Sequence, residues 1–231
     1  MCRRWDVTLP RMGDDPELSN YRESACTYFR YMHVLFICTG NLCRSPIAER
    51  LATTWLQHGS GGLERDGVRI TSAGLLAADG DPMDPRSAAA LVGLGGDPSG
   101  FRSRRLTSEL TADADLVLTM TRRHRRSVLE MTPRGLRRTF TLREAAVLLR
   151  RADLGGLART PVDERARQLG LRLDAQRAWH ASSRSDDIED PFGRRMPVHQ
   201  GVAHTIATAL RPLTDVLFRG IPPRHSALAD G

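Results

Sequence analysis

The sequence predicts an α/β fold: a four-stranded parallel sheet with helices on both faces and an anion-binding loop after the first strand. Four short apolar segments have strand character, and a stretch with helical periodicity follows each of them. This alternation favours one parallel sheet whose right-handed crossovers place helices on both faces. The loop after the first strand then lies at the carboxyl edge of the sheet, where open α/β folds bind ligands.

The strands are expected where β-branched, aromatic and leucine residues cluster, at 34–37, 68–72, 116–120 and 138–142. Helices are expected where apolar residues recur every three or four positions, at 47–59, 84–94, 107–112, 122–128, 143–152, 162–180 and 197–218. The simplest interpretation of the RRHRR run at 122–126 is a solvated helix face, with steering of anionic partners as the alternative. His199 and His204 are expected on the surface of the last helix.

The chain is expected to form one domain with extensions. Residues 1–31 are polar and interrupted by proline and glycine, so they predict a poorly ordered N-terminal extension. The domain itself is expected at 32–219, with a helical insertion at 154–185 that either gates the site or packs as ordinary surface. Residues 220–231 contain little to bury and predict a flexible tail.

The charge of the chain favours anionic partners. All 34 basic residues are arginine, and the formal net charge is +7 over 231 residues. Phosphoesters, acidic protein segments and nucleic acids all suit such a balance. Composition alone does not choose among them.

The cysteines indicate a reducing compartment rather than a disulfide or zinc framework. All four, Cys2, Cys26, Cys38 and Cys43, lie in the first quarter of the chain, and their spacing matches no zinc motif. We therefore expect no metal and no cofactor. No apolar stretch approaches the ~20 residues of a membrane span, and the N-terminus lacks the apolar core of a signal peptide. These observations predict a cytoplasmic protein without a membrane span.

The loop CTGNLCR at 38–44 has the features of an anion cradle. A loop that runs from a strand into a helix N-terminus points successive N–H groups at one spot, where the helix end adds positive charge. Gly40 and Asn41 tolerate the left-handed backbone that such a turn uses. A positive field favours the thiolate form of a cysteine, here Cys38. The planar fork of Arg44 suits a tetrahedral oxyanion, and Ser45 is placed to hydrogen-bond the sulfur.

With those residues in view, VLFICTGNLCRSPIAE resembles the anion loop of the low-molecular-weight protein tyrosine phosphatases, in their bacterial branch. The resemblance implies that Cys38 is the nucleophile, that Arg44 binds the phosphoryl group, that Ser45 assists the thiolate and that Asn41 holds the shape of the loop. The substrate-binding residues would be Thr39, Gly40, Asn41, Leu42, Cys43, Arg44 and Ser45.

A second segment, DIEDPFG at 187–193, resembles the Asp-Pro loop of the same family. By this resemblance Asp190 is the general acid, Pro191 stiffens the loop and Phe192 lines the mouth of the pocket. Ser72, at the end of the second strand, is then a candidate hydrogen-bond donor that supports Asn41.

The resemblance implies a protein-tyrosine phosphatase that hydrolyses phosphotyrosine through a phosphocysteine intermediate without a cofactor. The implied partner is a phosphotyrosine-bearing protein, with a bacterial tyrosine kinase or an exopolysaccharide-system protein as candidates. The chain departs from eukaryotic-type relatives at 75–78, where LLAA replaces the aromatic wall of the specificity loop.

Two other functions compete with a phosphatase. An arsenate reductase on the same fold would use a small thiol as reductant, because the chain has no cysteine after Cys43 to relay oxidation. An arginine-rich nucleic-acid module would show a known reader motif or interleaved aromatic and basic residues, and the sequence has neither. We therefore expect no nucleic-acid partner.

Overall fold

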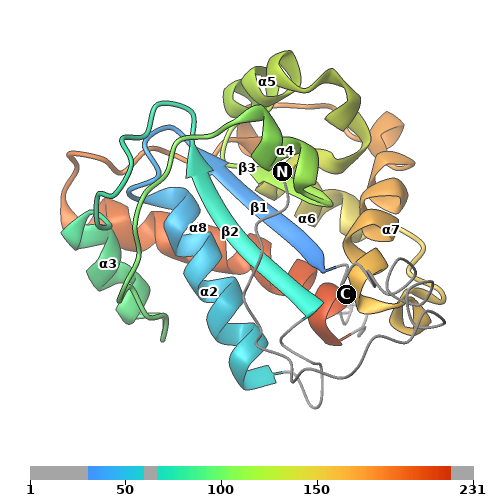
Figure 1. Cartoon of the computed structure of the whole chain (residues 1–231), viewed down its shortest axis with the longest axis horizontal. Coiled ribbons are helices and arrows are strands. Elements are labelled where there is room, and N and C mark those ends of the chain that lie inside the picture. The colour runs from blue at the N-terminus through green and yellow to red at the C-terminus, as the bar shows by residue number, and fades with distance from the viewer. Residues whose placement is uncertain (1–30, 60–66, 220–231) are drawn as a thin grey trace, which may run out of the picture. The chain divides into compact units, whose positions relative to one another are not determined.

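A computed structural model of the chain describes residues 31–59 and 67–219 (Figure 1). In this part of the chain four strands, β1 (Met32–Cys38), β2 (Val68–Gly74), β3 (Leu116–Thr119) and β4 (Thr139–Thr141), form one sheet in the order β2-β1-β3-β4. Every pairing in the sheet is parallel. The predicted fold class is confirmed.

β1 lies at the centre of the sheet and all of its residues are buried. Its register sets Cys38 opposite Gly74 on β2, and Ile37 opposite Thr119 on β3. Because the strands are parallel, the segments that leave all of them start from the same carboxyl edge. The sheet therefore gathers residues that are distant in the sequence around the end of β1.

Helices cover both faces of this sheet (Figure 1). They are α2 (Arg44–Gly59), α3 (Pro85–Val92), α4 (Ser108–Asp113), α5 (Arg122–Met131), α6 (Leu142–Leu149), α7 (Val162–Asp174) and α8 (Met196–Thr214), which a π-helical turn extends over Asp215–Arg219. Val34 and Phe36 share a core with α2, α6, α7 and α8. Leu35 and Ile37, which point to the other face, pack with Val128 of α5 and Leu110 of α4.

Local sequence explains where α5 begins. Thr121 follows β3 in an extended conformation, and its side chain accepts a hydrogen bond from the backbone N–H of His124. Threonine at this N-cap position satisfies one of the N–H groups that the first turn leaves open. The cap fixes the first turn of α5 beside the carboxyl edge of the sheet.

Within the segment expected as a helical insertion, the helix α7 packs into the core, whereas most of residues 178–185 are exposed. α7 ends at Asp174, so the expected helix at 162–180 is shorter than predicted, and only a 3₁₀ turn follows at Arg177–Trp179. Ala166 and Leu169 of α7 are fully buried. Arg167 of the same helix binds Asp115, which precedes β3, so α7 lies at the amino ends of the strands. It does not gate the carboxyl edge.

His199 was expected on the surface, and this prediction is wrong. The side chain is fully buried, and its Nδ1 lies 2.9 Å from the hydroxyl of Ser87 on α3. This bond satisfies Nδ1 at the packed α3–α8 contact, whereas the buried Nε2 has no hydrogen-bond partner in the described part of the chain. His204 of the same helix is exposed, as predicted.

The predicted extension at 1–31, apart from Tyr31, and the predicted tail at 220–231 lie outside the described residues. Among the described residues no helix is both long and apolar enough to cross a membrane.

Candidate active site

Cys38 lies at the carboxyl end of β1, where the chain turns toward α2. Its Sγ accepts a hydrogen bond from the backbone N–H of Asn41 at 3.3 Å and lies 2.9 Å from the Ser45 hydroxyl. Only 2% of the residue is exposed. The loop therefore holds the sulfur in one position and surrounds it with hydrogen-bond donors.

Asn41 gives the loop its shape. Its φ of 55° lies in the left-handed region, where asparagine is one of the few tolerated side chains. Its Nδ2 donates to the hydroxyls of Ser45 (2.9 Å) and Ser72 (2.8 Å), and its Oδ1 accepts from the Arg104 backbone at 2.9 Å. Three separate segments thus hold this one side chain.

Ser72 supports Asn41 in the opposite sense from the one predicted. Its hydroxyl accepts from Asn41 and donates to a carboxylate oxygen of Glu49 on α2 at 2.5 Å. Burial raises the pKa of Glu49 above its ordinary value, although the hydrogen bond from Ser72 opposes this. Glu49 and Arg104, which the sequence did not single out, belong to the same buried network.

Gly74 lets the loop approach β2. A Cβ atom at this position would lie 2.6 Å from the carbonyl oxygen of Thr39 and 2.8 Å from the amide nitrogen of Asn41. Both neighbours are backbone atoms that cannot move independently of the loop. The glycine is required by this close approach.

Arg44 points from the first turn of α2 toward the predicted Asp-Pro loop. Its Nη2 donates to Asp190 Oδ2 at 2.7 Å and to Thr39 Oγ1 at 3.3 Å, and its Nη1 donates to the carbonyl of Ile188 at 3.1 Å. The residue is 4% exposed, whereas half of the Asp190 side chain is exposed. The buried guanidinium of Arg44 therefore holds the exposed carboxylate of Asp190 at the rim of the loop.

The segment with Asp190 is anchored to the sheet. The backbone N–H of Ile188 donates to the carbonyl of Met120, directly after β3, at 2.8 Å. Pro191 is buried behind Asp190, while Phe192 is 63% exposed. This anchoring brings two motifs 146 positions apart, Arg44 and Asp190, into direct contact.

His124 is a site residue that sequence reasoning missed. It comes from the RRHRR run, yet it is only 5% exposed, and its Nε2 lies 2.9 Å from Thr39 Oγ1. Burial lowers the pKa of His124 to about 4, and the positive charge of Arg44 acts in the same direction. The imidazole is therefore neutral at pH 7 and braces the loop without adding charge.

Cys43, Asp84 and His199 offer one potential metal-ligand atom each within 4.8 Å of one another, behind the loop. Hydrogen bonds already occupy these groups. Asp84 Oδ1 caps α3 through two backbone N–H groups, and Ser87 bonds His199. Burial raises the pKa of the Cys43 thiol to about 12, so it stays protonated. The cluster supports the loop as a hydrogen-bonded network.

A pocket of about 200 Å³ opens above the loop. It is lined by Cys38, Thr39, Gly40, Leu42, Cys43, Arg44, Asp190 and Phe192, and the surface it exposes is largely apolar. Most of the predicted site residues therefore meet in one place. A sulfur nucleophile, an arginine fork and a carboxylate around one small pocket suit transfer of a phosphoryl group.

Fold and loop together define the class: a phosphoryl-transfer enzyme that works through a thiol. The model of the low molecular weight phosphotyrosine protein phosphatase family matches residues 33–155. The chain belongs to this family of hydrolases, whose general mechanism passes through a phosphocysteine. The predicted family and enzyme class are confirmed.

Proteins similar to this chain are named either as arginine phosphatases or as tyrosine phosphatases. The protein-arginine-phosphatase of Bacillus subtilis is 36% identical over 119 residues, which are 49% of this chain and 71% of the relative. The low molecular weight protein-tyrosine-phosphatase Etp of Escherichia coli K12 is 34% identical over 104 residues, 45% of this chain and 64% of the relative. The YwlE arginine phosphatase of Geobacillus stearothermophilus has a similar fold, with a TM-score of 0.58, 26% identity and coverage of 82% of this chain and 94% of that structure. These names disfavour the arsenate reductase alternative.

Proposed function

We propose that this chain hydrolyses phosphotyrosine in proteins, with Cys38 as nucleophile, Arg44 as phosphoryl-binding residue and Asp190 as general acid and base. The observation that carries this proposal is the convergence of all three on one pocket, with Arg44 in contact with Asp190 at 2.7 Å. Leu42 and Phe192 provide apolar carbon around the mouth, which suits an aromatic ring.

In the first step the Cys38 thiolate attacks phosphorus in line with the leaving oxygen. The S–P bond forms while the bond between phosphorus and the phenolic oxygen breaks, and protonated Asp190 gives its proton to that oxygen. The Arg44 guanidinium and the loop amides stabilise the equatorial phosphoryl oxygens. Tyrosine leaves as the neutral phenol.

In the second step a water molecule attacks the phosphocysteine. Asp190, now a carboxylate, accepts the proton of that water, the S–P bond breaks and the electron pair returns to sulfur. The Asn41 amide and the Ser45 hydroxyl stabilise the departing thiolate, since both already contact Sγ. Phosphate leaves, and Asp190 is protonated for the next cycle.

Phosphoarginine is the second candidate substrate, because the Bacillus subtilis relative is named a protein-arginine-phosphatase. A guanidinium group in the pocket would need a carboxylate or other acceptors along its walls. Asp190 is the acidic residue that lines the pocket, and it already pairs with Arg44. The apolar character of the other walls favours a phenyl ring over a guanidinium.

The proposed partner is a phosphotyrosine-bearing protein, with a bacterial tyrosine kinase or an exopolysaccharide-system protein as candidates, and the proposed compartment is the cytoplasm. A relative of Ralstonia solanacearum named probable low molecular weight protein-tyrosine-phosphatase EpsP is 34% identical over 111 residues. The free Cys38 and Cys43 thiols suit a reducing compartment.

The test is a substrate panel of peptides that carry phosphotyrosine, phosphoserine, phosphothreonine or phosphoarginine, with arsenate reduction by a small thiol measured in parallel. We expect the highest kcat/KM with phosphotyrosine. A higher value with phosphoarginine would transfer the proposal to that substrate, and arsenate reduction without ester hydrolysis would reject it.

A further inference from the structure

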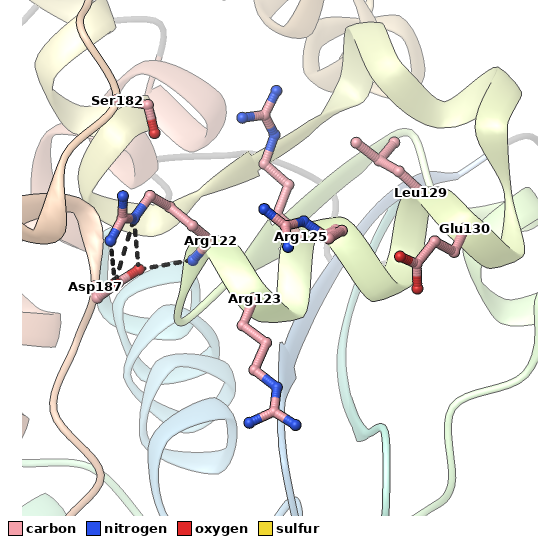
Figure 2. A pocket seen from close by; sticks show the side chains of 8 residues that line it. Arg122, Arg123, Arg125, Leu129, Glu130, Ser182 and Asp187 are labelled. Carbon is pink, nitrogen blue, oxygen red and sulfur yellow. Dashed lines mark hydrogen bonds and ion pairs between the residues drawn. The ribbon is translucent and has the colours of Figure 1, made fainter.

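A basic groove lies along α5, beside the phosphate pocket. It has a volume of about 770 Å³ and is lined by Arg122, Arg123, Arg125, Arg126, Leu129, Glu130, Ser182 and Asp187. Figure 2 shows the labelled side chains of this groove, which come from α5 and from the segment that carries Ser182 and Asp187. Four cations against two carboxylates leave the groove with an excess of positive charge.

Two of the four arginines are held by the protein itself. Arg122 donates from its backbone N–H and its guanidinium to Asp187, with distances of 2.7 and 3.0 Å (Figure 2). Arg125 lies 3.6 Å from Glu144, the buried carboxylate of the α6 capping box. Both therefore serve the fold.

Arg123 and Arg126 are both exposed and have no carboxylate at ion-pair distance within the described part of the chain. They lie three positions apart on α5, so their side chains are neighbours on one helix face. Two like charges at this spacing repel each other weakly, and a bound anion would relieve this repulsion. Their exposure leaves them available to a ligand.

Two residues connect the groove to the phosphate pocket. His124, between the arginines, contacts Thr39 of the anion loop, and Asp187 lies three residues before Asp190. The ten residues of α5 span about 15 Å at 1.5 Å per residue. An extended peptide covers this length with about four or five residues at about 3.3 Å each.

We infer that this groove binds an acidic segment of the substrate protein next to the phosphorylated residue, through Arg123 and Arg126. This inference rests on the proposed function, because it places the phosphoryl group of the same substrate on the anion loop. Carboxylates at neighbouring positions of the substrate then pair with the two arginines. The groove thereby selects among phosphoproteins that all offer the same phosphoryl group.

The experiment compares two phosphotyrosine peptides of equal length, one flanked by glutamate and the other by glutamine at the same positions. The variants are Arg123→Gln/Arg126→Gln and, as a charge-matched control, Arg150→Gln/Arg151→Gln. Both control arginines are exposed just past α6, which runs away from the carboxyl edge. A small aryl phosphate without flanking residues reports the chemistry alone.

We expect wild type to prefer the glutamate peptide by about fivefold in kcat/KM at low ionic strength, mainly through KM. High salt should reduce this preference. The Arg123/Arg126 variant should lose it while retaining wild-type rates on the aryl phosphate, and the Arg150/Arg151 variant should keep it.

Equal rates on both peptides in wild type, or a preference that survives in the Arg123/Arg126 variant, would overturn the groove assignment alone. If wild type hydrolyses the aryl phosphate but neither phosphotyrosine peptide, the proposed function is wrong and the groove assignment fails with it.

Discussion

α5 and α7 are both rich in arginine, but they use it differently. On α7, Arg165 donates to the carbonyls of Leu217, Ala158 and Thr160, and Arg167 binds Asp115. On α5, Arg123 and Arg126 have no such partner in the described part of the chain. α7 lies at the amino ends of the strands and α5 at the carboxyl edge, next to the anion loop.

The difference shows that the number of arginines in a segment does not reveal its function. An arginine whose terminal nitrogens donate to carbonyl groups of its own chain, as those of Arg165 do, is a structural crosslink. An arginine without such acceptors keeps its charge available for a ligand. Whether an arginine is structural or available to a ligand depends on the acceptor groups that the fold places next to its helix. Substitutions at the two ends of the sheet should therefore have different consequences.

The largest effect is expected at the carboxyl edge, from Cys38→Ser. Without the thiolate, kcat should fall by about 10⁵-fold or more. Arg44 and the loop amides remain, so the variant should still bind inorganic phosphate, as measured by calorimetry. Near-normal hydrolysis by the variant would show that Cys38 is not the nucleophile.

Asp190→Asn should lower kcat by about 10²–10⁴-fold for substrates whose leaving group needs a proton. The loss should shrink for an aryl phosphate with a strongly activated leaving group, which departs as the anion. The measurement is kcat for a series of aryl phosphates of graded leaving-group pKa. A uniform loss across the series would exclude Asp190 as the acid.

At the opposite end of the sheet, Arg165→Met should reduce stability rather than catalysis. Arg165 is 6% exposed, and its loss leaves three backbone carbonyls without their donor. We expect the free energy of unfolding to fall by about 3 kcal/mol. Denaturant titration measures this, with Arg123→Met as the matched control that should change it little. A loss of kcat at full stability would contradict the division between the two ends.

The smallest effect concerns the pH dependence of stability through His124. Its pKa of about 4 lies below the value of 6.5 expected for an unfolded chain. Between these values the unfolded chain binds a proton that the folded protein excludes, so stability falls as pH falls. Between pH 7 and pH 4.5 this amounts to about 2 kcal/mol.

His124→Gln should remove this part of the pH dependence in denaturant titrations. His204→Gln, at an exposed position of α8, is the control and should leave the slope as in wild type. An unchanged slope in the His124 variant would mean that the buried imidazole is not the responsible group.

The predicted residues that line the pocket come from two short motifs, the loop after the first strand and the Asp-Pro segment at 187–193. Cys38, Arg44 and Ser45 fall within eight residues between a strand and a helix, so local pattern was sufficient. His124 was hidden because an RRHRR run resembles a solvated face, and only the fold turns its histidine toward Thr39. Its place directly after a predicted parallel strand was the one available signal.

Burial of polar residues was the main property that the sequence did not predict. His199 was expected on the surface because helical periodicity assigns polar residues to the solvent face. The decisive fact is that Ser87, 112 positions earlier, supplies a hydrogen bond. Glu49 and Arg104 were missed for the same reason, since their partners come from other segments. By contrast, the parallel sheet followed from the alternation of strands and helices.

The pairing of Arg44 with Asp190 also affects which anions bind in the pocket, because each must compete with the Asp190 carboxylate for the Arg44 guanidinium. An entering anion has to offer the guanidinium more than a carboxylate at 2.7 Å already does. A phosphomonoester dianion meets this condition, because its oxygens engage the guanidinium and the loop amides together. Chloride and simple carboxylates carry a single charge and fewer acceptors. In its ionised form Asp190 therefore competes with any monovalent anion for the Arg44 guanidinium.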